Sequence, residues 1–299
     1  MNGIDRAAPY RDAIVSEVCY ALGAPRRGAM HGILAPLLRL PVGRFARLAA
    51  RVDDAVERGG LSEAARGILP DLSLHPAARG ADEIPAAGPL LIVSNHPGVF
   101  DSVAILACLP RRDVKVVLSD APFFRVFAAA RRWFIFAPLN AAGGAKSLRA
   151  CLEHLAGGGA LLIFANGDVE PDPASSPGAD RTFANWSRSV EIMLRRVPRT
   201  RLQAAIASGV MDPKFLRSPL TRLRKDETRR QKLAEVLQIM SLMISPRSVR
   251  IRPRISFARP VPAPDLEAEG GMPAVIAAAR RLYEDHLASL GTPGWREIE

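Results

Sequence analysis

The sequence has few cysteines, few aromatic residues and no long uninterrupted hydrophobic run. Its three cysteines, Cys19, Cys108 and Cys151, have no close pair, which excludes a disulfide framework and a zinc ribbon. We expect them to be small buried residues and expect no metal site. The longest non-polar stretch, residues 155–165, has 11 residues with three glycines, whereas a membrane-spanning helix needs about 20. A membrane-spanning protein is therefore excluded.

The N-terminal residues carry no recognisable export signal. Asp5 and Glu17 are acidic, and no basic segment is followed by an apolar one. We therefore expect a cytoplasmic protein. The chain has 299 residues, of which 48% are hydrophobic and 24% charged, and this is typical of a globular chain with one large domain or two small ones.

The net charge of +11 comes from one region. Residues 195–259 contain 17 Lys and Arg against four acids, and the rest of the chain is slightly negative. Such a field attracts an anionic membrane face, a phosphorylated substrate or nucleic acid. No stacking aromatics, RNP-like run or zinc spacing accompanies the charge, so we expect no nucleic-acid partner. The alternative is a solvated basic face without a specific partner.

Residues 1–80 are predicted to be helical. Apolar residues at helical spacing form one stripe of an amphipathic helix, which Gly59-Gly60 should end, and arginines occupy the other faces. We expect the stripe to pack on the domain that follows, because most such stripes face a protein core. The alternative is a helix that lies on a lipid surface with its arginines at headgroup level. The stripe consists of Phe45, Leu48, Ala49, Val52 and Val56.

From residue 81, short apolar runs alternate with helical patterns. This alternation predicts a layered α/β fold with a mostly parallel central sheet flanked by helices, preceded by the N-terminal helical region. The predicted strands are residues 90–94, 114–118, 133–137, 160–165, 203–210 and 249–257, the last at an edge because Pro253 lacks a ladder donor. The predicted helices are residues 103–109, 147–155, 186–197, 227–244 and 273–290. The expected regions are 1–80, an α/β domain at 81–260 that contains the basic segment 195–259, and a C-terminal helix and tail at 261–299.

One of the five histidines directly follows a predicted strand. His96 comes after the strand 90–94, at the end of the sheet where α/β proteins keep their sites, and just before a helix that Asp101 initiates. In a continuous helix the two side chains would point about 140° apart. The Pro97-Gly98 step permits a turn, from which the carboxylate can accept a hydrogen bond from one ring nitrogen and leave the other as a general base. The alternative is a buried histidine bound to a helix cap.

The segment around His96 resembles the first motif of a known enzyme family. Asn95-His96, four residues and then Asp101, preceded by the lead-in EIPAAGP at 83–89, is similar to that motif in the glycerolipid acyltransferases, the lysophosphatidic acid acyltransferase (PlsC-like) superfamily. The resemblance covers roughly residues 80–210. It implies that His96 deprotonates an acceptor hydroxyl, which attacks the thioester of acyl-CoA or acyl carrier protein, that Asp101 supports it, and that no cofactor is needed.

The later motifs depart from the family pattern. The second resembles residues 132–140, with Asn140 near the usual arginine, and the third resembles FANG at 164–167, with Asn166 in place of the usual glutamate. In the family these residues help to hold the acceptor's glycerol phosphate. Because an asparagine cannot supply a carboxylate's charge, glycerol 3-phosphate is a less expected acceptor.

Other residues of the resemblance are candidates for substrate contacts. Glu170 could return a carboxylate to the site, and Arg132 is one of several arginines that could meet a phosphate. We expect Asn95, Asn166 and Gly167 to shape the acceptor and oxyanion region.

The resemblance favours a peripheral membrane acyltransferase on the inner face of the cell membrane. It would move a fatty acyl group to a hydroxyl of a lysophospholipid or related lipid, and meet anionic lipid through the N-terminal helix and residues 195–259. The alternative is a lipid-binding protein of the same fold with a decayed acceptor site, which Asn140 and Asn166 motivate. A third possibility is thioester hydrolysis, with water as the acceptor.

Overall fold

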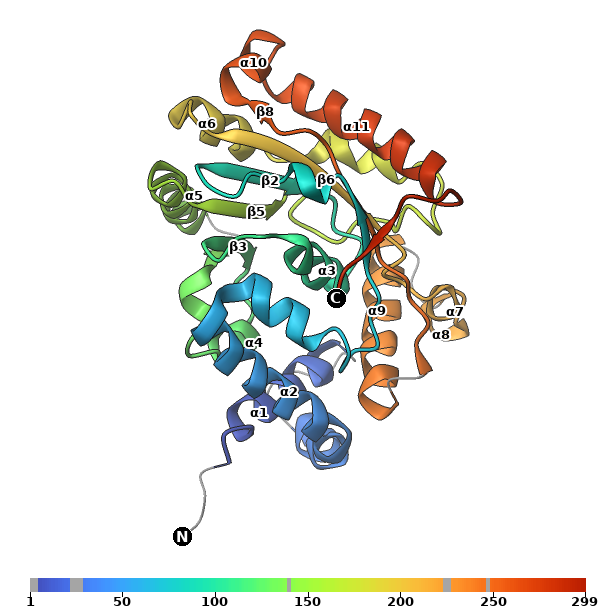
Figure 1. The fold of residues 1–299 in the computed structure, drawn as a ribbon. Coiled ribbons are helices and arrows are strands. Elements are labelled where there is room, and N and C mark those ends of the chain that lie inside the picture. The colour runs from blue at the N-terminus through green and yellow to red at the C-terminus, as the bar shows by residue number, and fades with distance from the viewer. Residues whose placement is uncertain (1–4, 22–28, 139–140, 223–226, 246–247) are drawn as a thin grey trace.

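The computed structural model describes residues 5–21, 29–138, 141–222, 227–245 and 248–299. They form a central nine-stranded sheet with helices on both faces (Figure 1). The strands are β1 (Ala77–Arg79), β2 (Leu90–Ser94), β3 (Val114–Ser119), β4 (Phe134–Ala137), β5 (Ala160–Phe164), β6 (Arg201–Ser208), β7 (Arg254–Phe257), β8 (Val261–Pro262) and β9 (Arg296–Glu297).

Eleven helices of the described residues surround this sheet. They are α1 (Ala8–Ala21), α2 (Ala29–Ile68), α3 (Val99–Cys108), α4 (Pro122–Arg125), α5 (Ala141–Ala156), α6 (Ser189–Arg196), α7 (Pro213–Leu216), α8 (Pro219–Arg222), α9 (Glu227–Ile244), α10 (Ala263–Ala268) and α11 (Met272–Ser289). Short 3-10 helices are η1 (Ala81–Glu83), η2 (Ala130–Trp133) and η3 (Ala179–Asn185).

The sheet is mostly parallel, which confirms the predicted fold class. Its strand order is β4-β3-β5-β2-β6-β7-β1-β9, with β8 paired to β6. Every pair from β4 to β6 runs parallel, and the antiparallel pairs are β6–β7, β1–β9 and β6–β8. The carboxyl end of β2 is therefore flanked by the carboxyl ends of β5 and β6.

The central strands β2 and β5 are apolar along most of their length because both faces of the sheet are covered. In β2, Leu90 and Ile92 belong to a core shared with α1, α2, α3 and α9, whereas Leu91 and Val93 belong to a second core shared with α5, α6 and α11. All four side chains are fully buried, and each contributes about 1.5–3 kcal/mol by leaving water. The three cysteines are also buried, as expected.

The prediction of an edge strand at 249–257 is wrong. The strand is only Arg254–Phe257, and it lies inside the sheet between β6 and β1. Pro253 precedes the strand, so its missing N–H removes no ladder hydrogen bond, and its carbonyl oxygen accepts from the Ala77 N–H at 3.0 Å.

The N-terminal helices pack on the α/β domain. Within the predicted stripe, Leu48, Ala49 and Val56 are buried in the core under the sheet, and Phe45 and Val52 pack against that core. The packing interpretation of this stripe is therefore confirmed. None of the helices in the described part of the chain combines the length and hydropathy needed to cross a bilayer.

The glycine pair after the stripe kinks α2 rather than ending it. Gly60 has φ +78°, a conformation that glycine adopts without strain, and the helix resumes beyond it to Ile68. A Cβ at Gly60 would also lie 2.7 Å from the carbonyl oxygen of Arg112. The prediction of a break was correct in position, but the chain continues as a helix because the residues beyond the kink again pack on the core.

One buried carboxylate ties the N-terminal helices to the sheet. Asp53 of α2 accepts a hydrogen bond from the Tyr10 hydroxyl at 2.9 Å and from the backbone N–H groups of Ala128, Ala129 and Ala130. Successive N–H groups aimed at one carboxylate are a favourable way to bury its charge. This contact fixes α1 and α2 against the segment that leads into β4.

Candidate active site

His96 lies on the turn between β2 and α3, at the carboxyl end of the parallel strands. Its ring lies against the ring of Phe164, the last residue of β5, with 4.4 Å between the ring centroids. About a quarter of the side-chain surface, 26%, is exposed. The imidazole is therefore accessible from outside and is not enclosed in the core.

The hydrogen bond expected between His96 and Asp101 is present. The Nδ1 atom of His96 lies 2.8 Å from Oδ2 of Asp101, whose side chain is 0% exposed. In the part of the chain that the structure describes, no group hydrogen-bonds to Nε2. The carboxylate selects the tautomer that is protonated at Nδ1, so Nε2 of the neutral ring presents a lone pair.

Asp101 reaches this position because it occupies the first turn of α3. Its Oδ2 also accepts from the Gly98 N–H at 3.1 Å, in a capping-box arrangement, while its own N–H donates to the Gly98 carbonyl at 3.0 Å. The other oxygen, Oδ1, is buried and has no hydrogen-bond partner among the described residues. One carboxylate therefore starts the helix and orients the ring.

A second carboxylate approaches the same turn from α9. Glu235 Oε1 accepts from the Val99 N–H in a short hydrogen bond. Gly98 has φ +152°, and a Cβ there would lie 3.1 Å from the same oxygen. The turn after His96 therefore needs glycine for its backbone conformation and for the close approach of Glu235.

The surrounding carboxylates change the acid–base behaviour of His96. Burial alone would lower the pKa of the ring, but the charge and hydrogen bond of Asp101, with Glu235 and Glu170 farther away, raise it to about 9. The protonated ring is thus strongly stabilised. Burial in turn raises the pKa values of Glu170 and Glu235.

Glu170 is brought directly under His96, and it binds the backbone there. Its Oε2 accepts from the His96 N–H at 2.9 Å, and its own N–H donates to the His96 carbonyl at 2.7 Å. The other oxygen accepts from the Thr182 hydroxyl and from Trp186 Nε1. The carboxylate predicted to return to the site contacts the His96 turn, but it is 1% exposed and holds the backbone of that turn.

Asn95 also holds the turn. Its side-chain amide donates to the Ala207 carbonyl at 2.9 Å and accepts from the Ala207 N–H at 2.8 Å, so it ties the end of β2 to β6. The side chain is buried and both of its polar atoms are occupied. In this structure it therefore faces the sheet and not an acceptor.

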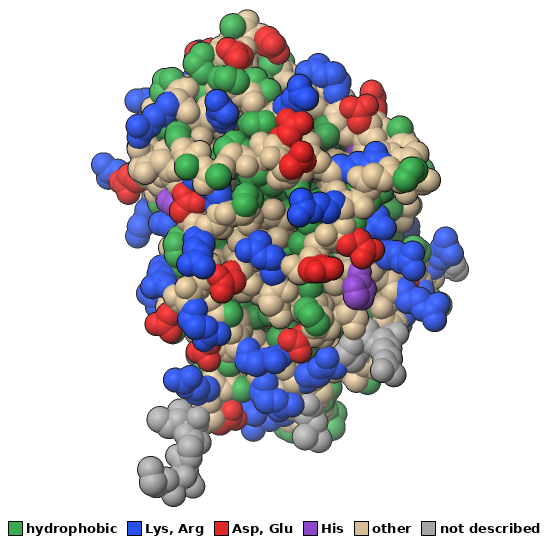
Figure 2. Space-filling view, viewed as in Figure 1, with side chains coloured by type: hydrophobic (Ala, Val, Ile, Leu, Met, Phe, Trp, Pro, Cys, Tyr) green, Lys and Arg blue, Asp and Glu red, His purple; other side chains and the backbone are tan. Residues whose placement is uncertain are grey.

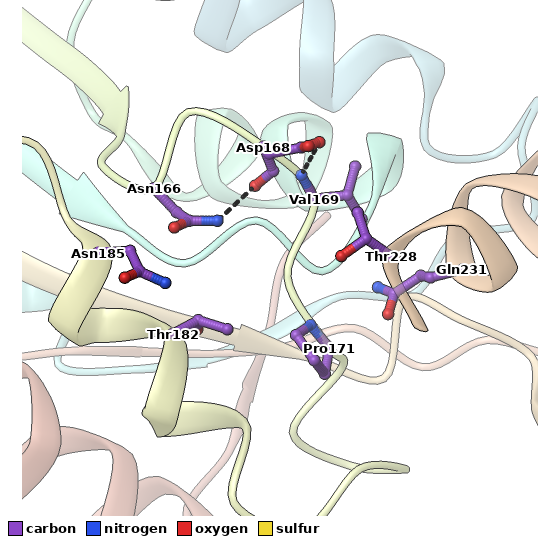
Figure 3. Close-up of a pocket in the computed structure, with 8 residues that line it drawn as sticks. All are labelled: Asn166, Asp168, Val169, Pro171, Thr182, Asn185, Thr228 and Gln231. Carbon is purple, nitrogen blue, oxygen red and sulfur yellow. Dashed lines mark hydrogen bonds between the residues drawn. The ribbon is translucent and has the colours of Figure 1, made fainter. Parts of the chain in front are cut away.

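Asn166 and Gly167 follow β5 beside the His96 turn. Asn166 lines a cavity of about 200 Å³, which Figure 3 shows between the loop after β5 and helix α9. The Gly167 N–H donates to the Phe164 carbonyl at 3.1 Å, so this amide is not free to stabilise an oxyanion as predicted. The φ of +73° at Gly167 belongs to the turn that makes this internal bond.

The second-motif residues are not assembled with His96. Asn140 lies outside the described residues. The Arg132 guanidinium donates to the Glu57 carbonyl at 3.3 Å and lies over the Trp133 ring, next to edge strand β4. Because β3 and β5 separate β4 from β2, Arg132 is placed to anchor α2 and not to meet a phosphate at His96.

The sequence analysis missed the role of α9. Gln231, Glu235 and Gln238 lie on one face of this helix at spacings of four and three residues. Gln231 donates to the Pro97 carbonyl at 2.9 Å, and Gln238 bonds the backbone of Val210 and Asp212 after β6. The helix itself was predicted, and this polar stripe within it was the available signal.

A buried aspartate in the loop after β5, which no sequence pattern had indicated, binds this loop to the end of β6. Asp172 accepts from the N–H groups of Gly209, Val210 and Met211 at 2.9–3.0 Å. Its contacts join the loop to the end of β6. The site is thus built from the ends of β2, β5 and β6 with α9 across them.

Comparisons with known proteins found one family model and a solved structure. Residues 75–194 match the model of the family described as Acyltransferase. The crystal structure of the 1-acyl-sn-glycerophosphate acyltransferase PlsC from Thermotoga maritima aligns over 98% of this chain and 100% of that chain, with 11% identity and a TM-score of 0.44. No curated protein sequence matches. The part of the chain that is similar to the Acyltransferase family model, residues 75–194, includes His96, Asp101 and Glu170.

Proposed function

We propose that this protein transfers a fatty acyl group from acyl-CoA or acyl carrier protein to a hydroxyl of a lysophospholipid or related lipid, with His96 as the general base. The observation that carries the proposal is the His96–Asp101 pair: Nδ1 is engaged, no hydrogen bond of the described residues occupies Nε2, and 26% of the side-chain surface is exposed. The family of residues 75–194 supplies the reaction type.

Each proton in this reaction has a defined place. Nε2 takes the proton of the acceptor hydroxyl as the oxygen attacks the thioester carbonyl. The tetrahedral intermediate then collapses, the carbon–sulfur bond breaks, and the thiolate receives the proton from Nε2. Asp101 keeps Nδ1 protonated and stabilises the imidazolium between the two steps.

The test is transfer by the purified protein. Incubated with acyl-CoA and a panel of lysolipids, it should release one free thiol for each acylated lipid, measured by a thiol reagent and by mass spectrometry of the lipids. Binding of lysolipid without either product would favour a lipid-binding protein with a decayed site. Thiol release without acylated lipid would favour thioester hydrolysis. Both results would contradict the proposal.

We further propose that the protein meets its lipid on the anionic inner face of the cell membrane. Ile33 and Leu37, one helical turn apart at the start of α2, are 69% and 71% exposed. Helix α9 of the basic segment packs against α1 and α2. Figure 2 shows Lys and Arg side chains over much of this face of the molecule, including the lower part, where Figure 1 places α1 and α2. Apolar side chains among basic ones favour an anionic lipid surface.

Replacing both exposed side chains by aspartate should weaken vesicle binding. Each apolar side chain contributes about 1.5 kcal/mol on entering lipid, so the double variant Ile33→Asp/Leu37→Asp should lose roughly 100-fold in partition into phosphatidylglycerol-containing vesicles, measured by co-sedimentation. The control is Ile192→Asp, since Ile192 is 41% exposed on α6 at the opposite end of the molecule (Figure 1). Equal losses in both variants would contradict this membrane face.

A further inference from the structure

The cavity beside His96 has a lining that is polar and almost uncharged. Of the eight residues that form its wall of about 200 Å³, only Asp168 is ionisable, and none is Lys, Arg or His. Amide and hydroxyl groups dominate the rest. The lining consists of Asn166, Asp168, Val169, Pro171, Thr182, Asn185, Thr228 and Gln231 (Figure 3).

Three contacts connect this cavity to the catalytic turn. Gln231 donates to the Pro97 carbonyl, directly after His96. Thr182 donates to Glu170, whose other oxygen accepts from the His96 N–H. Asn166 stands two residues after Phe164, the ring that lies against His96. The cavity and the His96 turn therefore share their supporting residues.

The charge around the cavity disfavours phosphate. Glu170 and Asp172, both about 1% exposed, lie in the same loop as the lining, between residues 166 and 182. Among the described residues, the cation that pairs with the lining is Lys232, whose Nζ lies 2.7 Å from Asp168 Oδ1 and is thus already neutralised. A phosphate monoester that enters such a cavity loses water without gaining a free cation, which is unfavourable.

The same groups suit hydroxyl and amino groups. Amide and hydroxyl side chains both donate and accept, and so can satisfy a hydroxyl. The contact of Asp168 with the Lys232 ammonium shows that this carboxylate is placed to accept from an ammonium group. An amine on a ligand that displaces Lys232 would form the same charge-assisted bond with Asp168.

On the basis of the proposed function, we infer that this cavity holds the head group of the acyl acceptor, and that it selects a head group with hydroxyl or amino groups and without phosphate. The inference narrows the acceptor from a lysophospholipid or related lipid to a non-phosphorylated amphiphile. It rests on the juxtaposition of an uncharged polar cavity with the His96 turn.

The acceptor panel that tests this inference contains amphiphiles of matched chain length. We expect kcat/KM for a monoacylglycerol and for a long-chain 2-amino-1,3-diol to exceed that for lysophosphatidic acid by about tenfold or more. Asp168→Asn should lower kcat/KM for the amino-diol about tenfold more than it lowers kcat/KM for the monoacylglycerol. Preference of the wild-type protein for lysophosphatidic acid would overturn the inference while leaving the proposed function intact.

A second test is a variant that should gain activity toward lysophosphatidic acid. Asn185 is exposed at the cavity wall, so Asn185→Arg should raise kcat/KM for lysophosphatidic acid about tenfold by adding the missing cation. Ala277→Arg adds the same charge on exposed α11 and should change nothing. If Asn185→Arg behaves like Ala277→Arg, the cavity does not hold the head group. If no acceptor is acylated at all, the proposed function fails. The inference about the cavity is then tested by calorimetric binding of the same amphiphiles. Tighter binding of lysophosphatidic acid than of the other amphiphiles would overturn the inference.

Discussion

Replacing His96 by asparagine should abolish acyl transfer and leave the fold intact. The amide nitrogen of asparagine can take the place of Nδ1 and donate to Asp101, so the buried carboxylate keeps its partner. What is lost is Nε2, and removal of a general base costs about 100- to 10,000-fold in rate. The measurement is kcat for transfer together with the free energy of unfolding in urea.

Two further variants make the His96 result specific. His96→Ala should be equally inactive and slightly less stable, because Asp101 then retains only the Gly98 N–H. His75 is an exposed histidine, so His75→Asn is the matched control and should behave as the wild-type protein. Full turnover by His96→Asn would contradict the role of His96 as the base.

Replacing Asp101 by asparagine should lower the rate and move its pH dependence. The base must be neutral, so kcat/KM rises with pH through the pKa of His96, which is about 9 in the wild-type protein. Burial pulls this pKa down, and Asp101 on α3 is the strongest of the groups that raise it, ahead of Glu235 on α9 and Glu170 in the loop after β5. Without the Asp101 charge the midpoint should shift to lower pH, with a plateau lower by about 100-fold or more because the imidazolium is less stabilised.

The raised pKa of His96 should also make the free energy of unfolding depend on pH. A raised pKa in the folded state stabilises the protein fully below the unfolded value of 6.5, and this stabilisation is lost as the pH rises through about 9. The free energy of unfolding of the wild-type protein should therefore fall between pH 6.5 and 9, and Asp101→Asn should remove most of this slope. Asp82→Asn, an exposed carboxylate on η1, is the control for both measurements. An unchanged midpoint and slope in Asp101→Asn would refute the coupling.

Because the pKa of His96 is high, bound substrate must help to keep the ring neutral at the working pH. At pH 7 only about one ring in a hundred is neutral when the pKa is about 9. Apolar substrate beside the ring excludes water and favours its neutral form, as burial already does. A bound acyl chain is therefore expected to lower the pKa of the base toward the working pH.

The core of the site was predictable because it is local in sequence. His96 and Asp101 are five residues apart, and the end of a strand, a Pro-Gly step and a helix start suffice to bring Nδ1 within 2.8 Å of the carboxylate. The strand Leu90–Ser94 was predicted with its correct bounds, because an apolar run covered on both faces has a clear pattern. The amphipathic stripe in α2 was equally predictable, since helical periodicity can be recognised without knowing which element the helix packs against.

The residues that support the turn were not predictable in this way. Glu170 and Glu235 are 74 and 136 residues from the backbone groups that they bind. Their proximity depends on β5 and β6 flanking β2 and on α9 crossing the strand ends, and no spacing in a single sequence reveals strand order. For the same reason, Asn95 was predicted to contact an acceptor but binds Ala207, and Gly167 was predicted to offer an amide that Phe164 already occupies.

The amino-acid sequence by itself determined the layered α/β class, the strand that delivers His96 and the pairing of that ring with Asp101, because each follows from periodicity or from neighbours within one turn. Only the tertiary structure decided which other acids surround the ring, that Arg132 contacts α2, and that an almost uncharged polar cavity shares residues with the supports of the His96 turn. The physical reason is that burial, hydrogen-bond partners and local charge are properties of several segments packed together, and the energy that fixes their packing comes from the whole core.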